Sequence, residues 1–228
     1  MSAEPCTSVP TVKICGLQSV EVLKSMINLP VDQVGFVFAT SKRQVRADQV
    51  AEMISFIRAQ DTFRPVTVGV FVNPQLDELI DLLKIAPLDV VQLHGQESAE
   101  FCQAVKTQCA VQIYKCHSLR ESSNPDSVSD SWDAYRDVID ALILDSYDPV
   151  YIGGSGKTFP WERIAPYQKW AKEAGIPLII AGGLHPGNVH ELLDRIHPDG
   201  VDVSSGVETD GVKDIVKITA FVERVKQQ

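Results

Sequence analysis

The chain has 228 residues, 44% of them hydrophobic, which is long for an average domain but normal for a single α/β barrel. Its formal net charge of -9 argues against a nucleic-acid-binding surface, so we expect no nucleic-acid partner. No apolar run approaches the roughly eighteen residues of a membrane span, and residues 1–10 carry neither a basic region nor an apolar block, so we expect a soluble, cytoplasmic protein without a membrane partner.

Short β-rich runs alternate with helical patterns along the chain. The expected strands are residues 12–15, 33–38, 67–72, 90–94, 111–116, 141–145, 178–181 and 201–204. The expected helices are residues 20–27, 47–59, 76–85, 98–106, 161–174, 189–196 and 212–226. Strand–helix alternation predicts a parallel sheet. Eight near-equal units in about 220 residues favour a single-domain (β/α)8 TIM barrel over an open doubly wound sheet.

The remaining segments set the expected boundaries. We expect one catalytic domain over residues 11–228, preceded by a disordered extension over residues 1–10. The polar stretch 118–131 predicts a loop after the fifth strand. Asn188 fits a helix cap and Gly175 a helix stop.

The five cysteines are odd in number and contain no Cys-x-x-Cys pair. This pattern suggests neither a disulfide framework nor a zinc site, so we expect free thiols and no bound metal.

Active sites of this barrel gather at the C-terminal ends of the strands, so the residues that follow each apolar run are the candidates. Cys15 and Asp145 end the first and sixth strands and are able to move a proton, with His94 of the fourth strand a third candidate. Alternatively, Cys15 is a small apolar core residue and Asp145 caps its loop.

A thiol with its ordinary pKa of about 8.5 is a poor base at neutral pH, so base catalysis by Cys15 requires backbone amides or a cation that lower its pKa. Lys13 lies two places before Cys15 on the same strand, so both side chains point to one side. We expect Lys13 to be buried beside Asp202 of the last strand and to act on the thiol.

The seventh and eighth strand ends, "AGGL" and "VSSGVE", combine glycines with hydroxyls ahead of helical patterns, as phosphate sites of this fold do. The expected phosphate ligands there are the amides of Gly183, Ser204, Ser205 and Gly206; the alternative is a pair of tight turns. Arg43 in "SKRQV" suits bidentate recognition of a carboxylate, although a solvated surface charge is the alternative.

The loop "GGSGKT" over residues 153–158 carries letters typical of nucleotide-binding loops. The phosphate-loop pattern requires a glycine five places before Gly156, where this chain has Tyr151. The loop is therefore better interpreted as an active-site loop whose Gly154, Ser155 and Gly156 present amides to an anion. We expect it to close over a phosphorylated substrate, with Lys157 either near the anion or anchoring the closed loop.

These segments, taken in order, resemble the phosphoribosylanthranilate isomerase family of tryptophan biosynthesis. The similar segments are "VKICG", "GFVF" with "SKR", "VGVFVN", "VQLHG", "LILDS" with "GGSGKTF", "AGGL", and "VDVSSGVE" with "GVKD", over residues 12 to 214. Such an enzyme interconverts N-(5-phosphoribosyl)anthranilate and 1-(2-carboxyphenylamino)-1-deoxyribulose 5-phosphate by an Amadori rearrangement without cofactor or metal.

The resemblance implies particular roles for the candidate residues. Cys15 would be the general base, Asp145 the general acid and Arg43 the ligand of the anthranilate carboxylate, with His94 lining the pocket. The phosphate would be held at Gly183 and at residues 204–206, helped by residues 154–156. The partner would be a small phosphorylated substrate, and the enzyme a monomer or a homodimer.

Two other classes of function remain open from the sequence alone. One is another phosphate-binding barrel isomerase or synthase of tryptophan or histidine biosynthesis. The histidine-pathway sugar isomerase is expected to use paired aspartates, which the cysteine at the end of the first strand argues against. The other is a nucleotide-binding module, which the failed spacing at Tyr151 argues against.

Overall fold

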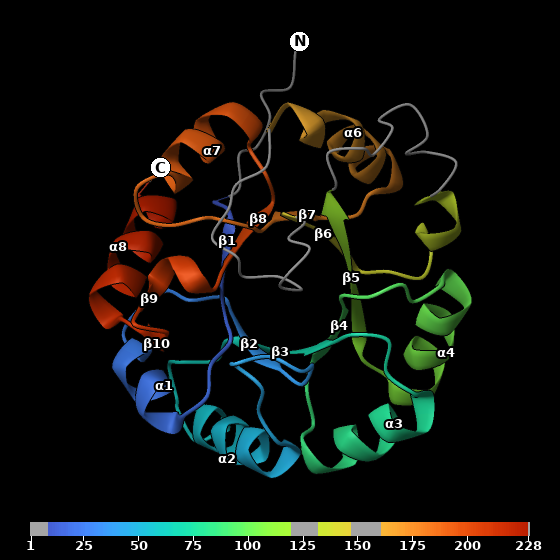
Figure 1. The fold of residues 1–228 in the computed structure, drawn as a ribbon, viewed down its shortest axis with the longest axis horizontal. Coiled ribbons are helices and arrows are strands. Elements are labelled where there is room, and N and C mark those ends of the chain that lie inside the picture. Colours follow the sequence, from blue (N-terminus) through green and yellow to red (C-terminus); the bar gives the residue numbers. More distant parts are fainter. Residues whose placement is uncertain (1–8, 120–131, 147–160, 228) are drawn as a thin grey trace.

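The computed structural model describes residues 9–119, 132–146 and 161–227. Eight parallel strands, paired in chain order with β8 beside β1, form a closed barrel that the helices surround (Figure 1). The strands are β1 (Thr11–Cys15), β2 (Gln33–Val37), β3 (Val66–Phe71), β4 (Val90–Leu93), β5 (Gln112–Leu119), β6 (Ala141–Ser146), β7 (Leu178–Ile180) and β8 (Gly200–Val203). The predicted (β/α)8 fold is confirmed, and each strand ends within three residues of its expected bounds.

Seven α-helices in the described part of the chain pack their apolar faces against the outside of the barrel (Figure 1). They are α1 (Val20–Met26), α2 (Ala47–Arg58), α3 (Leu76–Ile85), α4 (Ala99–Cys109), α6 (Ala165–Ala174), α7 (Val189–Ile196) and α8 (Ile215–Lys226). In α2 the buried residues Val50, Met53, Ile54 and Ile57 follow the helical period and so form one stripe. None of the described helices is long and apolar enough to cross a membrane.

A second, smaller core fills the inside of the barrel. Its buried residues come from alternate positions of the strands, as the period of two requires: Val68, Val90, Tyr114, Cys116, Ala141, Ile143, Ile179 and Ala181. This packed interior leaves space for a site only at the strand ends.

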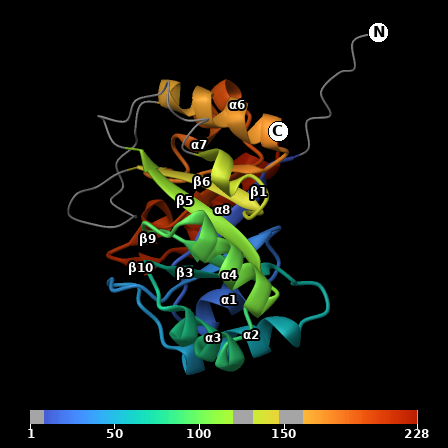
Figure 2. The same ribbon diagram turned by 90° about the vertical axis from the view of Figure 1, so that its right-hand side faces the viewer.

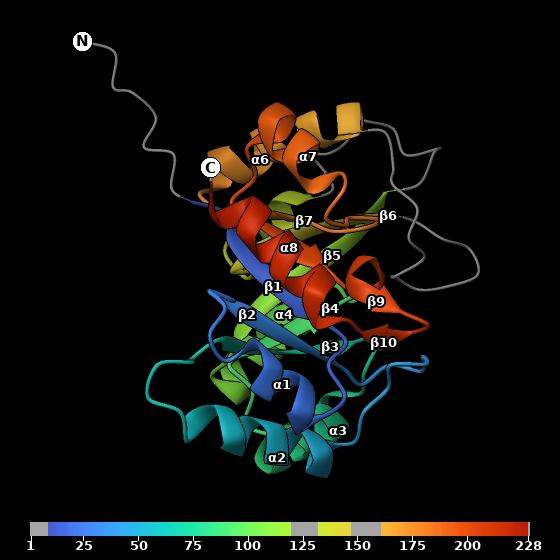
Figure 3. The same cartoon turned by 90° about the vertical axis from the view of Figure 1, so that its left-hand side faces the viewer.

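The prediction of a helix over residues 212–226 is wrong at its N-terminal end. A short antiparallel hairpin, β9 (Glu208–Thr209) and β10 (Val212–Lys213), comes first and lies at one end of the barrel (Figures 2 and 3). Its turn is Asp210-Gly211, where both residues have positive φ, a two-residue geometry that Asp-Gly favours. α8 begins only after Asp214, whose side chain accepts hydrogen bonds from the first-turn amides.

The helix expected over residues 161–174 starts as a 3-10 turn, η3 (Trp161–Ile164), before α6 begins. Gly175 ends α6 in the left-handed conformation, as predicted. Asn188 stands at the N-cap of α7 but does not cap it. Its side chain accepts from the amide of His185 and donates to the carbonyl of Gly183, so it closes the preceding loop instead.

Two expected loops fall mostly outside the described residues. The structure describes only Val9 and Pro10 of the extension over residues 1–10, and only Ser118 and Leu119 of the polar stretch 118–131. The described section before β6 contains the 3-10 turn η2 (Asp133–Tyr135).

Candidate active site

A cavity of about 440 Å³ lies at the C-terminal ends of the strands. It brings together seven of the residues predicted from the sequence: Cys15, Arg43, His94, Asp145, Gly183, Ser204 and Ser205. Six different strand ends supply them, as the fold predicts. Lys13 and Gly206 are not among the residues that line the cavity, and Gly154, Ser155, Gly156 and Lys157 lie outside the described part of the chain.

Cys15 ends β1 and is 7% exposed, so its thiol meets the cavity with little contact with bulk solvent. Its neighbour across the sheet is Gly35 of β2, and a Cβ atom on Gly35 would lie 2.7 Å from the Cys15 Sγ. The Ser204 hydroxyl donates to the Cys15 carbonyl at 3.1 Å, which joins the first strand end to the last. The thiol therefore occupies a space that only glycine at position 35 leaves open.

Lys13 lies beneath Cys15 in the barrel and is 1% exposed. Its Nζ is 2.8 Å from Oδ2 of Asp202, the residue paired with it in the register of β1 and β8. Burial acts to lower the pKa of the Lys13 ammonium, but Asp202 and Cys15 outweigh burial and raise it. The predicted buried pair is therefore present, and Lys13 stays charged.

Lys13 acts to lower the pKa of the Cys15 thiol, as predicted, but the pKa lies above its ordinary value on balance. Burial is the largest influence and raises the pKa of the thiol, while the Lys13 ammonium acts to lower it without prevailing. The nearby Asp202 carboxylate also raises it. The sequence revealed the cation but not the cost of desolvating a thiolate inside the barrel.

Asp145 is the penultimate residue of β6, is 4% exposed and lies beside His94 in the cavity wall. The His94 Nε2 lies 3.3 Å from Oδ2 of Asp145 and 3.4 Å from Sγ of Cys116. Burial acts to lower the pKa of His94, but Cys116 and Asp145 prevail and raise it well above its ordinary value. His94 therefore does more than line the pocket, because it contacts the predicted acid directly.

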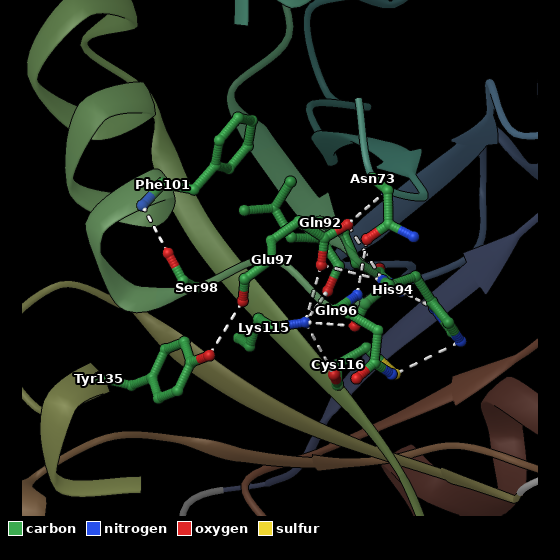
Figure 4. A network of polar contacts seen from close by, with 12 residues as sticks. Asn73, Gln92, His94, Gln96, Glu97, Ser98, Phe101, Lys115, Cys116 and Tyr135 are labelled. Carbon is green, nitrogen blue, oxygen red and sulfur yellow. Dashed lines mark hydrogen bonds and ion pairs between the residues drawn. The ribbon is translucent and has the colours of Figure 1, made fainter. Parts of the chain in front are cut away.

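A buried ion pair holds the backbone on both sides of His94 (Figure 4). The Lys115 Nζ is 2.8 Å from Oε2 of Glu97 and also donates to the carbonyls of Leu93 and Gly95, at 3.2 and 2.9 Å. Glu97 Oε1 in turn accepts from the amide of Asn73 at 2.7 Å. Because these bonds join the ends of β3, β4 and β5, they fix the turn that carries His94.

Arg43 is 7% exposed and lines the cavity, so the alternative of a solvated surface charge is wrong. Its Nε and Nη2 donate to the two carboxylate oxygens of Glu208 at 2.7 and 2.8 Å. Lys213 reaches the same carboxylate at 2.8 Å from the opposite strand of the hairpin. Burial acts to raise the pKa of Glu208, but Arg43 and Lys213 outweigh it and lower that pKa.

The glycine-rich strand ends of β7 and β8 pack against each other. Gly182 has a φ of +83°, and a Cβ there would lie 2.6 Å from the Ser146 hydroxyl and 2.7 Å from Oδ1 of Asp145. A Cβ on Gly206, in the turn η4 (Ser205–Val207), would collide with the carbonyl of Leu184. Both glycines are thus required for backbone to approach backbone at the rim of the cavity.

Comparison with known proteins identifies the family. The family model described as N-(5'phosphoribosyl)anthranilate (PRA) isomerase matches residues 12–224. The N-(5'-phosphoribosyl)anthranilate isomerase of Brevibacillus brevis is 44% identical over 214 residues, which cover 94% of this chain and 92% of the relative. The chain belongs to the phosphoribosylanthranilate isomerase family.

Solved structures of the family agree with this assignment. The enzyme of Thermotoga maritima has a TM-score of 0.79 and 32% identity, with 96% of this chain and 100% of that chain covered. A phosphoribosylanthranilate isomerase solved in complex with reduced 1-(o-carboxyphenylamino)-1-deoxyribulose 5-phosphate has a TM-score of 0.76 and 30% identity, with 96% and 100% covered. The resemblance seen in the sequence is confirmed, and the chain converts phosphoribosylanthranilate to carboxyphenylamino-deoxyribulose phosphate in tryptophan biosynthesis.

Several polar residues of this phosphoribosylanthranilate isomerase were missed from the sequence. They are Glu97, Lys115, Cys116, Glu208 and Lys213. The burial of Lys115 could have been predicted, because a charge inside the apolar run "IYKC" requires a buried partner. The pairing of Glu208 with Lys213 has a weaker indication in the sequence, namely the Asp-Gly turn that separates them and favours a hairpin.

Proposed function

We propose that Cys15 is the general base and Asp145 the general acid of the isomerisation. The observation that supports this most directly is that both buried side chains line one cavity from different strand ends, β1 and β6. A thiol and a carboxyl on separate walls are able to act on different atoms of one substrate, which an acid–base isomerisation requires.

The reaction then requires that the enzyme donate one proton to the substrate and remove one proton from it. The Asp145 carboxyl protonates the ring oxygen of the ribose, the C1'–O bond breaks, and the nitrogen lone pair forms an iminium. The Cys15 thiolate removes the C2' proton, and the electrons of that bond neutralise the iminium to give an enolamine. Tautomerisation of the enolamine yields the ketose, so no electrons enter or leave the substrate.

Lys13 is proposed to support the base. Its ammonium lies within the barrel next to Cys15 and acts to lower the thiol pKa, against the burial that raises it. Loss of a proton from Cys15 therefore creates a charge beside a cation that Asp202 holds in place. Lys13 is a positioning residue in this proposal, because it acts through Cys15 rather than on the substrate.

Arg43 is proposed to bind the anthranilate carboxylate. Its pair with Glu208 supports the role, because Glu208 accepts from Nε and Nη2 and holds the guanidinium at the cavity wall, which leaves the edge formed by Nη1 and Nη2 for a substrate carboxylate. The phosphate is proposed to bind at the opposite rim, to amides of Gly183 and of residues 204–206. Gly154, Ser155 and Gly156, together with Lys157, remain part of this proposal as the loop that covers the phosphate.

The remaining assignments concern partners and location. This chain is proposed to be a monomer or a homodimer, since the related enzyme of Thermotoga maritima is dimeric and monomers have been generated from it. Light scattering of the purified protein distinguishes the two. A cytoplasmic location is proposed from the biosynthetic role of the family.

Turnover of freshly generated phosphoribosylanthranilate tests the catalytic pair. We expect Cys15→Ser and Asp145→Asn each to lower kcat by about 10²- to 10⁴-fold, the usual contribution of a general acid or base. Cys102→Ser, a buried thiol on α4 away from the cavity, is the matched control and should keep its rate. Rates close to the wild-type value in either active-site variant would exclude the assignment for that residue.

A further inference from the structure

Three side chains with metal-binding atoms meet beside the proposed general acid. His94 follows β4, Cys116 lies on β5 and Asp145 lies near the end of β6, so three neighbouring strands supply them. One nitrogen, one sulfur and one carboxylate oxygen lie within 4.8 Å of one another. Figure 4 shows the imidazole of His94 turned toward the Cys116 sulfur. The reaction proposed above gives Cys116 no role.

Two of the three distances between these atoms match those between ligands of a tetrahedral zinc ion, and the third, from the Cys116 sulfur to the Asp145 carboxylate, is at most 4.8 Å. With metal–ligand bonds of about 2.3 Å to sulfur and about 2.0 Å to nitrogen or oxygen, tetrahedral angles place sulfur about 3.5 Å from nitrogen and nitrogen about 3.3 Å from oxygen. The Cys116 Sγ is 3.4 Å from the His94 Nε2, and that nitrogen is 3.3 Å from Oδ2 of Asp145. One thiolate, one imidazole and one carboxylate also suit a borderline-soft divalent cation better than Mg²⁺ or Ca²⁺.

We propose that His94, Cys116 and Asp145 form a binding site for Zn²⁺ and similar thiophilic divalent cations, with the fourth position open to the cavity. Gln92 completes the surroundings of the ligands. It is 1% exposed, its side-chain amide lies 3.1 Å from the His94 Nδ1, and its Oε1 has no partner among the described residues. Turned over, this amide accepts a hydrogen bond from Nδ1–H and leaves the Nε2 lone pair for the metal.

Occupation of this site inhibits the enzyme, a consequence that rests on the proposed role of Asp145. The metal binds Asp145 as a carboxylate and Cys116 as a thiolate, whose proton passes to solvent. A carboxylate bound to a cation has no proton to give to the ribose ring oxygen. The cation also occupies part of the cavity that the substrate needs. The site is therefore inhibitory, and the isomerisation itself gains nothing from the metal.

Cobalt(II) is the probe that tests the binding site without reference to activity. Titration of the wild-type protein with Co²⁺ should produce a thiolate-to-cobalt charge-transfer band and the strong visible bands of tetrahedral cobalt, and Zn²⁺ should abolish both. Cys15→Ser, which removes the other thiol of the cavity, should keep these bands, whereas Cys116→Ser and Cys116→Ala should lose them. Bands that persist in both Cys116 variants, or that vanish in Cys15→Ser, would overturn the site.

Inhibition is measured separately by turnover. Cys116→Ser should keep its metal-free rate and require at least about tenfold more Zn²⁺ for half-inhibition, because a hydroxyl is a far weaker ligand than a thiolate. Equal sensitivity of wild type and Cys116→Ser to Zn²⁺ would contradict the proposal. Tetrahedral cobalt binding without inhibition would retain the metal site and overturn both the inhibition and the assignment of Asp145 as the acid.

Discussion

Replacement of Gly35 by alanine tests whether the position of the Cys15 thiol controls the rate. The added Cβ would lie 2.7 Å from Sγ, 3.1 Å from Cα and 3.2 Å from Cβ of Cys15, whereas ordinary contacts begin at 3.4 Å. The sulfur must therefore move by about 0.7 Å, the difference between 2.7 and 3.4 Å. A displacement of about 1 Å at a reacting group costs about 10²-fold, so we expect kcat to fall about 10- to 100-fold.

The control is Gly69→Ala, which crowds a strand of the same barrel on its other side. A Cβ on Gly69 would meet Leu88 and lie 2.8 Å from a ring carbon of Phe71, away from the thiol. Both alanines should destabilise the fold by about 1–3 kcal/mol through overpacking. For a chain of this size that lowers Tm by about 2–12 °C.

Steady-state turnover, measured well below the Tm of both variants, separates the two effects. Only Gly35→Ala should lose kcat, and the alkylation rate of Cys15 should change in that variant alone. If Gly35→Ala retained the wild-type kcat while its Tm fell like that of Gly69→Ala, the thiol would not be the positioned base. The same loss of kcat in both variants would show that the rate responds to strain in the barrel rather than to Cys15.

Two further predictions concern the buried charges. Lys13→Met should lower the free energy of unfolding by about 3–5 kcal/mol in denaturant titrations, because it leaves Asp202 buried without its cation. It should also move the rising limb of the pH–kcat/KM profile to higher pH, since the ammonium lowers the pKa of Cys15; an unmoved limb would refute the coupling. The folded structure lowers the pKa of Glu208, so the ionised carboxylate stabilises the fold. This stabilisation is complete at pH values above the ordinary pKa of a glutamate, and it is lost as the pH falls through the lowered pKa. Glu208→Gln should therefore flatten the acid side of the Tm–pH curve. It should also raise KM, because Arg43 loses the carboxylate that holds its guanidinium. A Tm–pH curve parallel to that of the wild type would contradict the pairing.

Local patterns in the sequence were enough to predict the barrel and most of the cavity wall. Each strand is a short apolar run, and the fold itself requires the polar residue after it to face the site, so Cys15 and Asp145 were found without knowledge of any contact. The burial of Arg43 and its pairing with Glu208 were not predictable in this way. They depend on a hairpin of two-residue strands, too short to produce any periodic signal.

The pKa of Cys15 shows a different limit. The sequence places Lys13 on the correct side of β1, because residues two apart on a strand share a face. The sign of the net shift depends on the balance between that cation and desolvation, and burial is a property of the whole barrel. Likewise, no local pattern joins Cys116 to His94, which are 22 positions apart in the sequence.

The contacts between β1 and β8 make activity a marker of complete assembly. Cys15, Lys13 and Arg43 belong to the first fifth of the chain, yet their partners Ser204, Asp202 and Glu208 lie 165 to 189 positions later. A nascent or truncated chain that has not incorporated β8 and the hairpin after it lacks the groups that contact the first strand end and the Arg43 guanidinium. In a refolding experiment, the return of turnover should therefore coincide with the last step of barrel closure and follow the recovery of helical circular dichroism.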